Sequence, residues 1–199
     1  IVKPVDSQSS RGLFKISDEK KKSTLRKKIN EALQFSEKNY LLAEEFIKGT
    51  EITIEGICLD GKHYILSASQ KKHFRTGIAS ELAYPLSLEK SFWNSIQIFH
   101  DAVIEKTGFK HGLTHSEYII DEKNKSYKMV EMACRGGGTL IPSDIIPWVT
   151  GVPVYDLLYK QVVEDTTPSL TDYVDSKQKH AILHFFEFPS GRVKHITGL

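Results

Sequence analysis

The chain has 199 residues, of which 40% are hydrophobic and 26% are charged, and its formal net charge is +2 at pH 7. This length can form one sizeable core or two small lobes around a cleft, and the composition is that of a globular protein. The near-balanced charge excludes a general affinity for nucleic acid, and no apolar run approaches the ~18 residues that span a bilayer.

The two cysteines, Cys58 and Cys134, lie in apolar strand patterns, so reduced thiols are expected. No charged-then-apolar leader is present, and we therefore expect a cytoplasmic protein without a membrane partner. The chain starts without methionine and ends in a strand-like run, which leads us to expect a piece of a longer protein.

The first part of the chain predicts short strands around one helix. Strand patterns cover residues 1–3, 13–16 and 40–47, and a helix with an apolar stripe follows a cap at Ser17 or Asp18. Residues 52–59 and 64–68 alternate on either side of Asp60-Gly61, which indicates a hairpin. Residues 71–84 read as irregular and basic.

The second part predicts longer elements. A helix is expected over residues 87–106 with Gly108 as its C-terminal cap, and residues 115–138 predict a hairpin with a polar turn. Residues 140–150 predict a helix interrupted at Pro142 and Pro147, and residues 154–163 predict another. A polar connection over 165–179 leads to strands at 181–188 and 192–196. The mixture of helices with antiparallel hairpins indicates an α+β fold.

The 115–138 hairpin carries acids that can share one face. Because side chains alternate along a strand, Glu131 points the same way as Arg135, and Glu117 can lie beside it from the paired strand. Facing carboxylates call for a positive charge, and magnesium is commonly held by one or two carboxylates plus substrate oxygens. The alternative is an exposed hairpin with solvated acids.

Two earlier segments could bind parts of a nucleotide. Lys3 precedes a Ser/Gly loop, Ser7–Gly12, whose backbone N–H groups can face phosphate, although such loops are usually plain connections. The run from Glu44 to Glu51 leaves a strand at Gly49, so its backbone can pair with an adenine edge, unless it is only a strand end with exposed acids. The pair Lys71-Lys72 alone would most often be a surface feature.

The order of these motifs resembles the ATP-grasp superfamily over most of residues 1–152, and in particular its carboxylate–amine ligase and carbamoyl-phosphate-synthase-like branch. The resemblance implies two α+β lobes that hold ATP between antiparallel sheets. Residues 1–47 would form the small lobe and residues 48–165 the large lobe with the metal site. Residues 166–199 would begin a C-terminal subdomain that is cut short.

The resemblance also implies a role for each matching residue. Lys3, Ser9, Ser10 and Gly12 would bind the nucleotide phosphates. Glu44, Glu45, Phe46 and Ile47 would frame adenine, and Glu51 would bind the ribose. Lys71, with Lys72 as the alternative, would reach a phosphate. Glu117 and Glu131 would hold Mg²⁺, with Mn²⁺ as a substitute, and Arg135 would bind the acyl phosphate or its carboxylate precursor.

The implied activity joins a small-molecule carboxylate to an amine through an acyl phosphate, and a homodimer is compatible with the branch. Many members carry Asn where this chain has Ala133, which removes one metal ligand. The chain also starts at the Lys-Pro strand, so the family's preceding domain is absent and this piece is expected to be inactive alone. A non-catalytic ATP-binding module is therefore the alternative.

Overall fold

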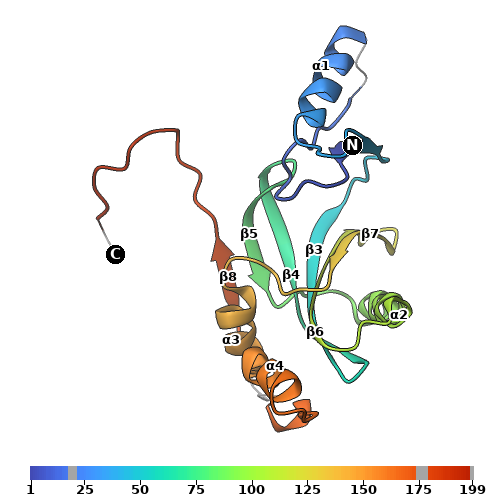
Figure 1. Cartoon of the computed structure of the whole chain (residues 1–199), viewed down its shortest axis with the longest axis vertical. Coiled ribbons are helices and arrows are strands. Elements are labelled where there is room, and N and C mark those ends of the chain that lie inside the picture. Colours follow the sequence, from blue (N-terminus) through green and yellow to red (C-terminus); the bar gives the residue numbers. More distant parts are fainter. Residues whose placement is uncertain (18–21, 174–178, 198–199) are drawn as a thin grey trace.

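The computed structural model describes residues 1–17, 22–173 and 179–197 (Figure 1). Its centre is a six-stranded antiparallel sheet with strand order β7-β6-β3-β4-β5-β8. Neighbouring strands in this sheet are mostly joined by hairpins, as the Asp60-Gly61 turn required. The strands are β3 (Thr50–Leu59), β4 (Lys62–Arg75), β5 (Ile78–Tyr84), β6 (Gly112–Asp121), β7 (Ser126–Ala133) and β8 (Ala181–His184).

Helices cover both faces of this sheet, because β3 is buried on both sides. Ile52 and Ile54 pack against α2 (Lys90–Thr107). Ile57 and Leu59 point to the opposite face, where they pack against a π-helical turn (Ile141–Ile145), α3 (Ile146–Thr150) and α4 (Val154–Val162). Burial of each large side chain contributes about 1.5–3 kcal/mol. Figure 1 shows α2 on one side of the sheet and α3 and α4 on the other.

The first residues form a small unit at one end of the large sheet. The strands β1 (Val2–Pro4) and β2 (Leu41–Ala43) pair antiparallel, and α1 (Lys22–Leu33) contacts β1. This unit lies above the ends of β3, β4 and β5, as Figure 1 shows. At the other end of the chain, the segment after β8 extends away from the sheet.

The predicted α+β class is confirmed, with antiparallel sheets and helices between the strands. Gly108 caps α2 with a φ of 69°, and its N–H donates to the Glu105 carbonyl. The helix α2 starts at Lys90, slightly later than predicted, where the Glu89 side chain accepts from the N–H of Ser91. The interruption predicted at Pro142 and Pro147 appears as the π-helical turn that precedes α3.

The prediction that residues 71–84 are irregular is wrong. The strand β4 continues to Arg75, turns at Gly77 with a φ of 77°, and pairs with β5. The many basic residues made this segment look like a loop. In the structure Lys71 and His73 lie on a polar sheet face and form ion pairs there. Irregularities of register near His73 also break the simple alternation.

Four predicted strands are shorter than expected or absent. The 40–47 strand is limited to Leu41–Ala43, and the 13–16 strand is reduced to one bridge between Val2 and Phe14. Residues 192–196 form no strand, and residues 181–188 do so only as far as His184. A strand needs a partner for its backbone groups, and β1 offers only three residues. The helix α1 begins at Lys22, and the cap residue Asp18 lies outside the described residues.

In the described parts of the chain, no helix is both long enough and apolar enough to cross a membrane. Both cysteines are free thiols; Cys58 is buried and Cys134 is exposed.

Candidate functional site

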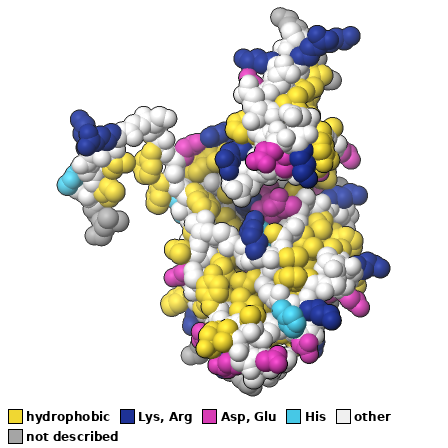
Figure 2. Space-filling view, viewed as in Figure 1, with side chains coloured by type: hydrophobic (Ala, Val, Ile, Leu, Met, Phe, Trp, Pro, Cys, Tyr) yellow, Lys and Arg dark blue, Asp and Glu magenta, His cyan; other side chains and the backbone are white. Residues whose placement is uncertain are grey.

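Polar side chains occupy the upper half of the sheet face that carries α3 and α4. On β3, Glu51, Thr53 and Glu55 alternate with the buried Ile52 and Ile54, so the three polar residues share one face. Figure 2 shows acidic and basic side chains gathered in a hollow between the N-terminal unit and the sheet. The sheet is therefore apolar beneath its helices and charged where it faces the N-terminal unit.

Lys71 lies at the centre of this polar face. It is opposite Glu51 in the β3–β4 register, and its Nζ is 2.6 Å from Glu51 Oε1 and 2.7 Å from Glu117 Oε1. Burial lowers the pKa of Lys71, but the neighbouring Glu117 and Glu51 outweigh this and raise it. Lys71 is therefore a partly buried ammonium between two carboxylates.

His115 extends this network along β6. It is opposite Glu55 in the register with β3, with its Nδ1 2.7 Å from Glu55 Oε1 and its Nε2 3.4 Å from Glu117 Oε1. Burial lowers the pKa of His115, but its bonds to Glu117 and Glu55 raise it to about 9. Burial also raises the pKa of Glu117, yet His115 and Lys71 together lower it to about 2. An imidazolium and an ammonium thus hold Glu117 ionised.

The predicted alignment of the two hairpin acids is present, since Glu117 and Glu131 are opposite each other in the β6–β7 register. Glu131 is exposed to solvent. Arg135 is also exposed, and its Nη1 donates to the Gly136 carbonyl at 2.9 Å. Beyond it, the N–H of Gly137 donates to Glu55 Oε2 at 3.3 Å, so the glycine loop contacts the polar face.

The acids at this face suit one kind of metal site. Within residues 1–17, 22–173 and 179–197, no group of three or more His, Cys, Asp or Glu side chains is arranged to hold a metal ion. A structural metal, which takes a full set of protein ligands, does not fit this arrangement. Two carboxylates from paired strands do fit magnesium, which takes its other oxygens from water and substrate phosphates.

The residues predicted to bind phosphate lie in the N-terminal unit. Lys3 is on β1, and its Nζ is 2.8 Å from Glu44 Oε2. Ser9 and Ser10 are exposed in the following loop with φ values of 57° and 56°, so both adopt left-handed backbone. Gly12 is buried, and a Cβ there would lie 2.8 Å from Pro4 Cγ. The loop is therefore tightly turned, with its serines facing solvent.

The residues predicted to frame adenine follow β2 without regular structure. Glu44 and Glu45 are exposed, while Phe46 and Ile47 are half-buried. The Lys15 ammonium lies 3.6 Å from the centre of the Phe46 ring. The structure thus places most of the predicted residues in two groups. Glu51, Lys71, Glu117 and Glu131 lie on the sheet, and Lys3, Ser9, Ser10, Gly12 and Glu44 lie in the N-terminal unit. Glu45, Phe46 and Ile47 lie in the connection that follows β2, and Arg135 lies on the glycine loop.

Contact between the phosphate-loop segment and the large sheet occurs at the tip of the β4–β5 hairpin. A Cβ added to Gly77 would lie 2.9 Å from the Cβ of Ser10. The predicted phosphate loop therefore lies against the turn that follows β4, the strand that carries Lys71.

Sequence reasoning missed three residues of the polar network. Glu55 and His115 are buried, and His73 places its Nε2 3.1 Å from Glu51 Oε2. One signal in the sequence could have found them. Residues two or four apart in a strand share a face, so Glu55 lies on the face of Glu51, and His115 lies on the face of Glu117. Their contact depends on the β3–β6 register, which the sequence does not specify.

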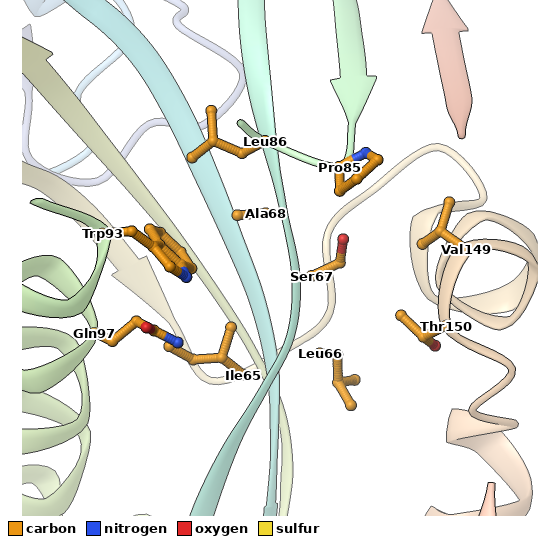
Figure 3. A pocket seen from close by; sticks show the side chains of 10 residues that line it. All are labelled: Ile65, Leu66, Ser67, Ala68, Pro85, Leu86, Trp93, Gln97, Val149 and Thr150. Atoms are coloured by element: carbon orange, nitrogen blue, oxygen red, sulfur yellow. The ribbon is translucent and has the colours of Figure 1, made fainter. Parts of the chain in front are cut away.

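Two cavities lie away from the polar face. One of about 350 Å³ is in the N-terminal unit between α1 and β2. The other, of about 270 Å³, lies beside β4 between α2 and α3 (Figure 3). None of the predicted site residues lines either cavity. The second cavity is lined by Ile65, Leu66, Ser67, Ala68, Pro85, Leu86, Trp93, Gln97, Val149 and Thr150, and none of these side chains is ionisable.

Comparison with known proteins identifies the type of domain. A family model described as an ATP-grasp domain matches residues 1–143, well over half of the chain. A curated relative, the carbamoyl phosphate synthase large chain of Clostridium acetobutylicum, is 27% identical over 165 residues, which cover 81% of this chain but 15% of the relative.

Two solved structures share the fold. Biotin carboxylase from Campylobacter jejuni, solved as a β,γ-ATP complex, has a TM-score of 0.75 at 17% identity, over 91% of this chain and 40% of its own. An L-amino acid ligase from Bacillus licheniformis has a TM-score of 0.65 at 20% identity, over 91% of this chain and 43% of its own. The chain thus spans less than half the length of each relative. The extent of the family match, together with this shared fold, shows that the chain belongs to the ATP-grasp domain family.

Proposed function

We propose that the chain is the nucleotide-binding part of an ATP- and magnesium-dependent ligase that joins a carboxylate to an amine. The observation that carries this proposal is the position of Lys71 between Glu51 and Glu117, with Glu131 opposite Glu117, on the open sheet face of an ATP-grasp domain. ATP would lie between residues 1–47 and residues 48–165. Acid and amine would be small molecules, as in the activity named for the L-amino acid ligase.

The charges on this face suit phosphoryl transfer. In the proposed reaction a carboxylate oxygen of the acid attacks the γ-phosphorus, and ADP leaves with the electron pair of the broken P–O bond. An amine nitrogen then attacks the acyl carbon, inorganic phosphate leaves, and the nitrogen loses a proton. Negative charge spreads over the phosphoryl oxygens during the first step, so the cations needed are those that Lys71 and Arg135 supply.

Each remaining residue has a proposed task in this scheme. Glu117 and Glu131 would hold magnesium, which neutralises phosphate charge when bound. Lys3 and the backbone of the Ser9–Gly12 turn would bind phosphates, for which turned loops and lysines are suited. Glu51 would accept from ribose hydroxyls, and Glu44, Glu45, Phe46 and Ile47 would surround adenine.

The test is calorimetric titration with ATP in the presence and absence of magnesium. We expect ATP affinity to depend on the metal, and Glu131→Gln to weaken ATP binding at least tenfold only when magnesium is present. Glu122→Gln, in the turn of the same hairpin, is the matched control and should bind like the wild type. Equal affinities for these two variants would remove Glu131 from the metal site.

A non-catalytic ATP-binding module is the second candidate, and Ala133 favours it. This residue is opposite His115 next to the proposed metal acids and offers no ligand oxygen. ATP binding that is unaffected by magnesium would support the module instead of the ligase.

A further inference from the structure

His115 and Glu55 form a buried charged pair on the site face that the scheme above leaves without a task. The exposed fraction is 7% for His115 and 2% for Glu55. A buried carboxylate and a buried imidazole each cost free energy unless they are paired and hydrogen-bonded. The groups that contact His115 and Glu55 therefore indicate why the pair is buried beside the site.

On one side the pair contacts the proposed metal acid. His115 Nδ1 is 2.7 Å from Glu55 Oε1 and its Nε2 is 3.4 Å from Glu117 Oε1. Lys71 donates to the same Glu117 oxygen at 2.7 Å. Among the described residues, no side chain or backbone group bonds to Glu117 Oε2. Lys71 and His115 thus hold one oxygen of Glu117 and leave the other available to a ligand.

On the other side the pair contacts the glycine loop. Glu55 Oε2 accepts from the N–H of Gly137 at 3.3 Å. A Cβ at Gly137 would lie 3.0 and 3.1 Å from the two Glu55 carboxylate oxygens, a tight contact that glycine avoids. The connection runs from Glu117 through His115 and Glu55 to the loop that follows Arg135.

We propose that His115 and Glu55 are positioning residues that orient Glu117 for the metal and tie it to the Gly136–Gly138 loop. The inference rests on the proposed function, since it assumes that Glu117 binds a metal. Partners that orient ligand side chains in this way typically change metal affinity by about 10–100-fold when removed. His115 and Glu55 act through Glu117 and the loop, without touching the metal themselves.

The first test measures Mn²⁺ affinity by electron paramagnetic resonance, with a non-hydrolysable ATP analogue present. We expect His115→Ala to weaken Mn²⁺ binding about 10–100-fold, while the analogue binds unchanged without metal. His100→Ala is the matched control, because His100 is an equally buried imidazole on the opposite sheet face, where its Nδ1 is 2.9 Å from the Tyr118 hydroxyl. It should bind Mn²⁺ like the wild type.

The second test is a double-mutant cycle between His115→Gln and Glu55→Gln. Both substitutions keep the approximate size of the side chain, so they serve if the alanine variant does not fold. If the two residues act as one unit, the double variant should lose about as much Mn²⁺ affinity as either single variant. His100→Gln combined with His115→Gln should instead give additive effects.

The outcomes separate this inference from the proposed function. Wild-type Mn²⁺ affinity in the His115 and Glu55 variants, with Glu131→Gln weakened, would overturn only the positioning role. Wild-type affinity in Glu117→Gln, or no metal binding by the wild type, would overturn both. Additive losses in the His115–Glu55 cycle would show two independent residues and would also reject the coupled pair.

Discussion

Lys71 and Lys72 are neighbours on β4 with different surroundings. The Lys71 side chain is 15% exposed and contacts Glu51 and Glu117, whereas Lys72 is 60% exposed and pairs with Glu81. Removing one partner from a buried ionic group leaves the others without a counter-charge, which is the costly way to break such a group. The two lysines therefore form a natural comparison.

We expect Lys71→Met to lower the free energy of unfolding by about 2 kcal/mol at pH 7, because Glu51 and Glu117 lose their shared cation. Lys72→Met should change it by less than about 0.5 kcal/mol, since exposed ion pairs contribute little. Urea unfolding of both variants measures the difference. Equal losses would mean that the Lys71 network stabilises the fold no more than the exposed Lys72–Glu81 pair does.

His100 makes the fold sensitive to acid on the opposite sheet face. It is fully buried, its Nε2 has no partner among the described residues, and His63, Asp101 and Tyr118 surround it. Burial, with His63 nearby, lowers the pKa of His100 to about 4. The unfolded chain therefore takes up a proton on this histidine at a higher pH than the folded protein does.

The sign of the pH effect follows from that order. The pKa of His100 in the unfolded chain is near 6.5. Its contribution to the free energy of unfolding is therefore fully present above this pH and is lost as the pH falls towards 4. We expect this histidine to account for at most about 3 kcal/mol of that loss. His100→Gln cannot gain a proton, and its urea midpoint should fall less steeply between pH 6.5 and 4. Parallel curves for the two proteins would contradict this assignment.

At the scale of elements, β3 is held closely between its neighbours. A Cβ at Gly56 would lie 2.3 Å from His63 Nε2 and 2.7 Å from Thr114 Oγ1, two atoms that are themselves 3.0 Å apart across the strand. Residue 56 also follows the register shift between β3 and β4. The side-chain contact between His63 on β4 and Thr114 on β6 thus crosses β3 at a position without a side chain.

Gly56→Ala should therefore lower the free energy of unfolding by about 1–3 kcal/mol, because the added methyl group separates His63 from Thr114. Gly138→Ala is the control, since a Cβ there meets no atom within 4 Å and the backbone is not left-handed. Thermal unfolding of both variants tests this. A Gly56 variant as stable as the control would show that the strands move apart at little cost.

At the scale of the whole molecule, local patterns in the sequence predicted much of the fold. The hairpin at Asp60-Gly61, the cap at Gly108 and the alignment of Glu117 with Glu131 depend on neighbouring residues, and all three are present. The β4–β5 hairpin was missed because its charged side chains are stabilised by other strands. The strand expected at 192–196 pairs with no other strand in the part of the chain that the structure describes.

The candidate site was predictable in its residue types but not in its contacts. Taken alone, the Lys71-Lys72 pair indicated a surface feature, and only the resemblance gave Lys71 a role, since the sheet register brings Glu51 and Glu117 to it. Glu55 and His115 escaped notice for the same reason. Separation along the chain is large for each of these contacts, so no local rule could have paired them.

The placement of the two cysteines gives the native chain a single reactive position. Burial raises the pKa of the Cys58 thiol to about 11, so it carries almost no thiolate at neutral pH, whereas Cys134 is exposed directly after β7 and before Arg135. A maleimide should modify one thiol in the folded protein and both in urea, and Cys134→Ser should take up none while folded. Mass spectrometry counts the adducts, and modification of Cys58 in the folded state would contradict the expectation. A fluorescent dye attached to the unaltered sequence would then sit at the end of the strand that carries Glu131, where it could report nucleotide binding directly.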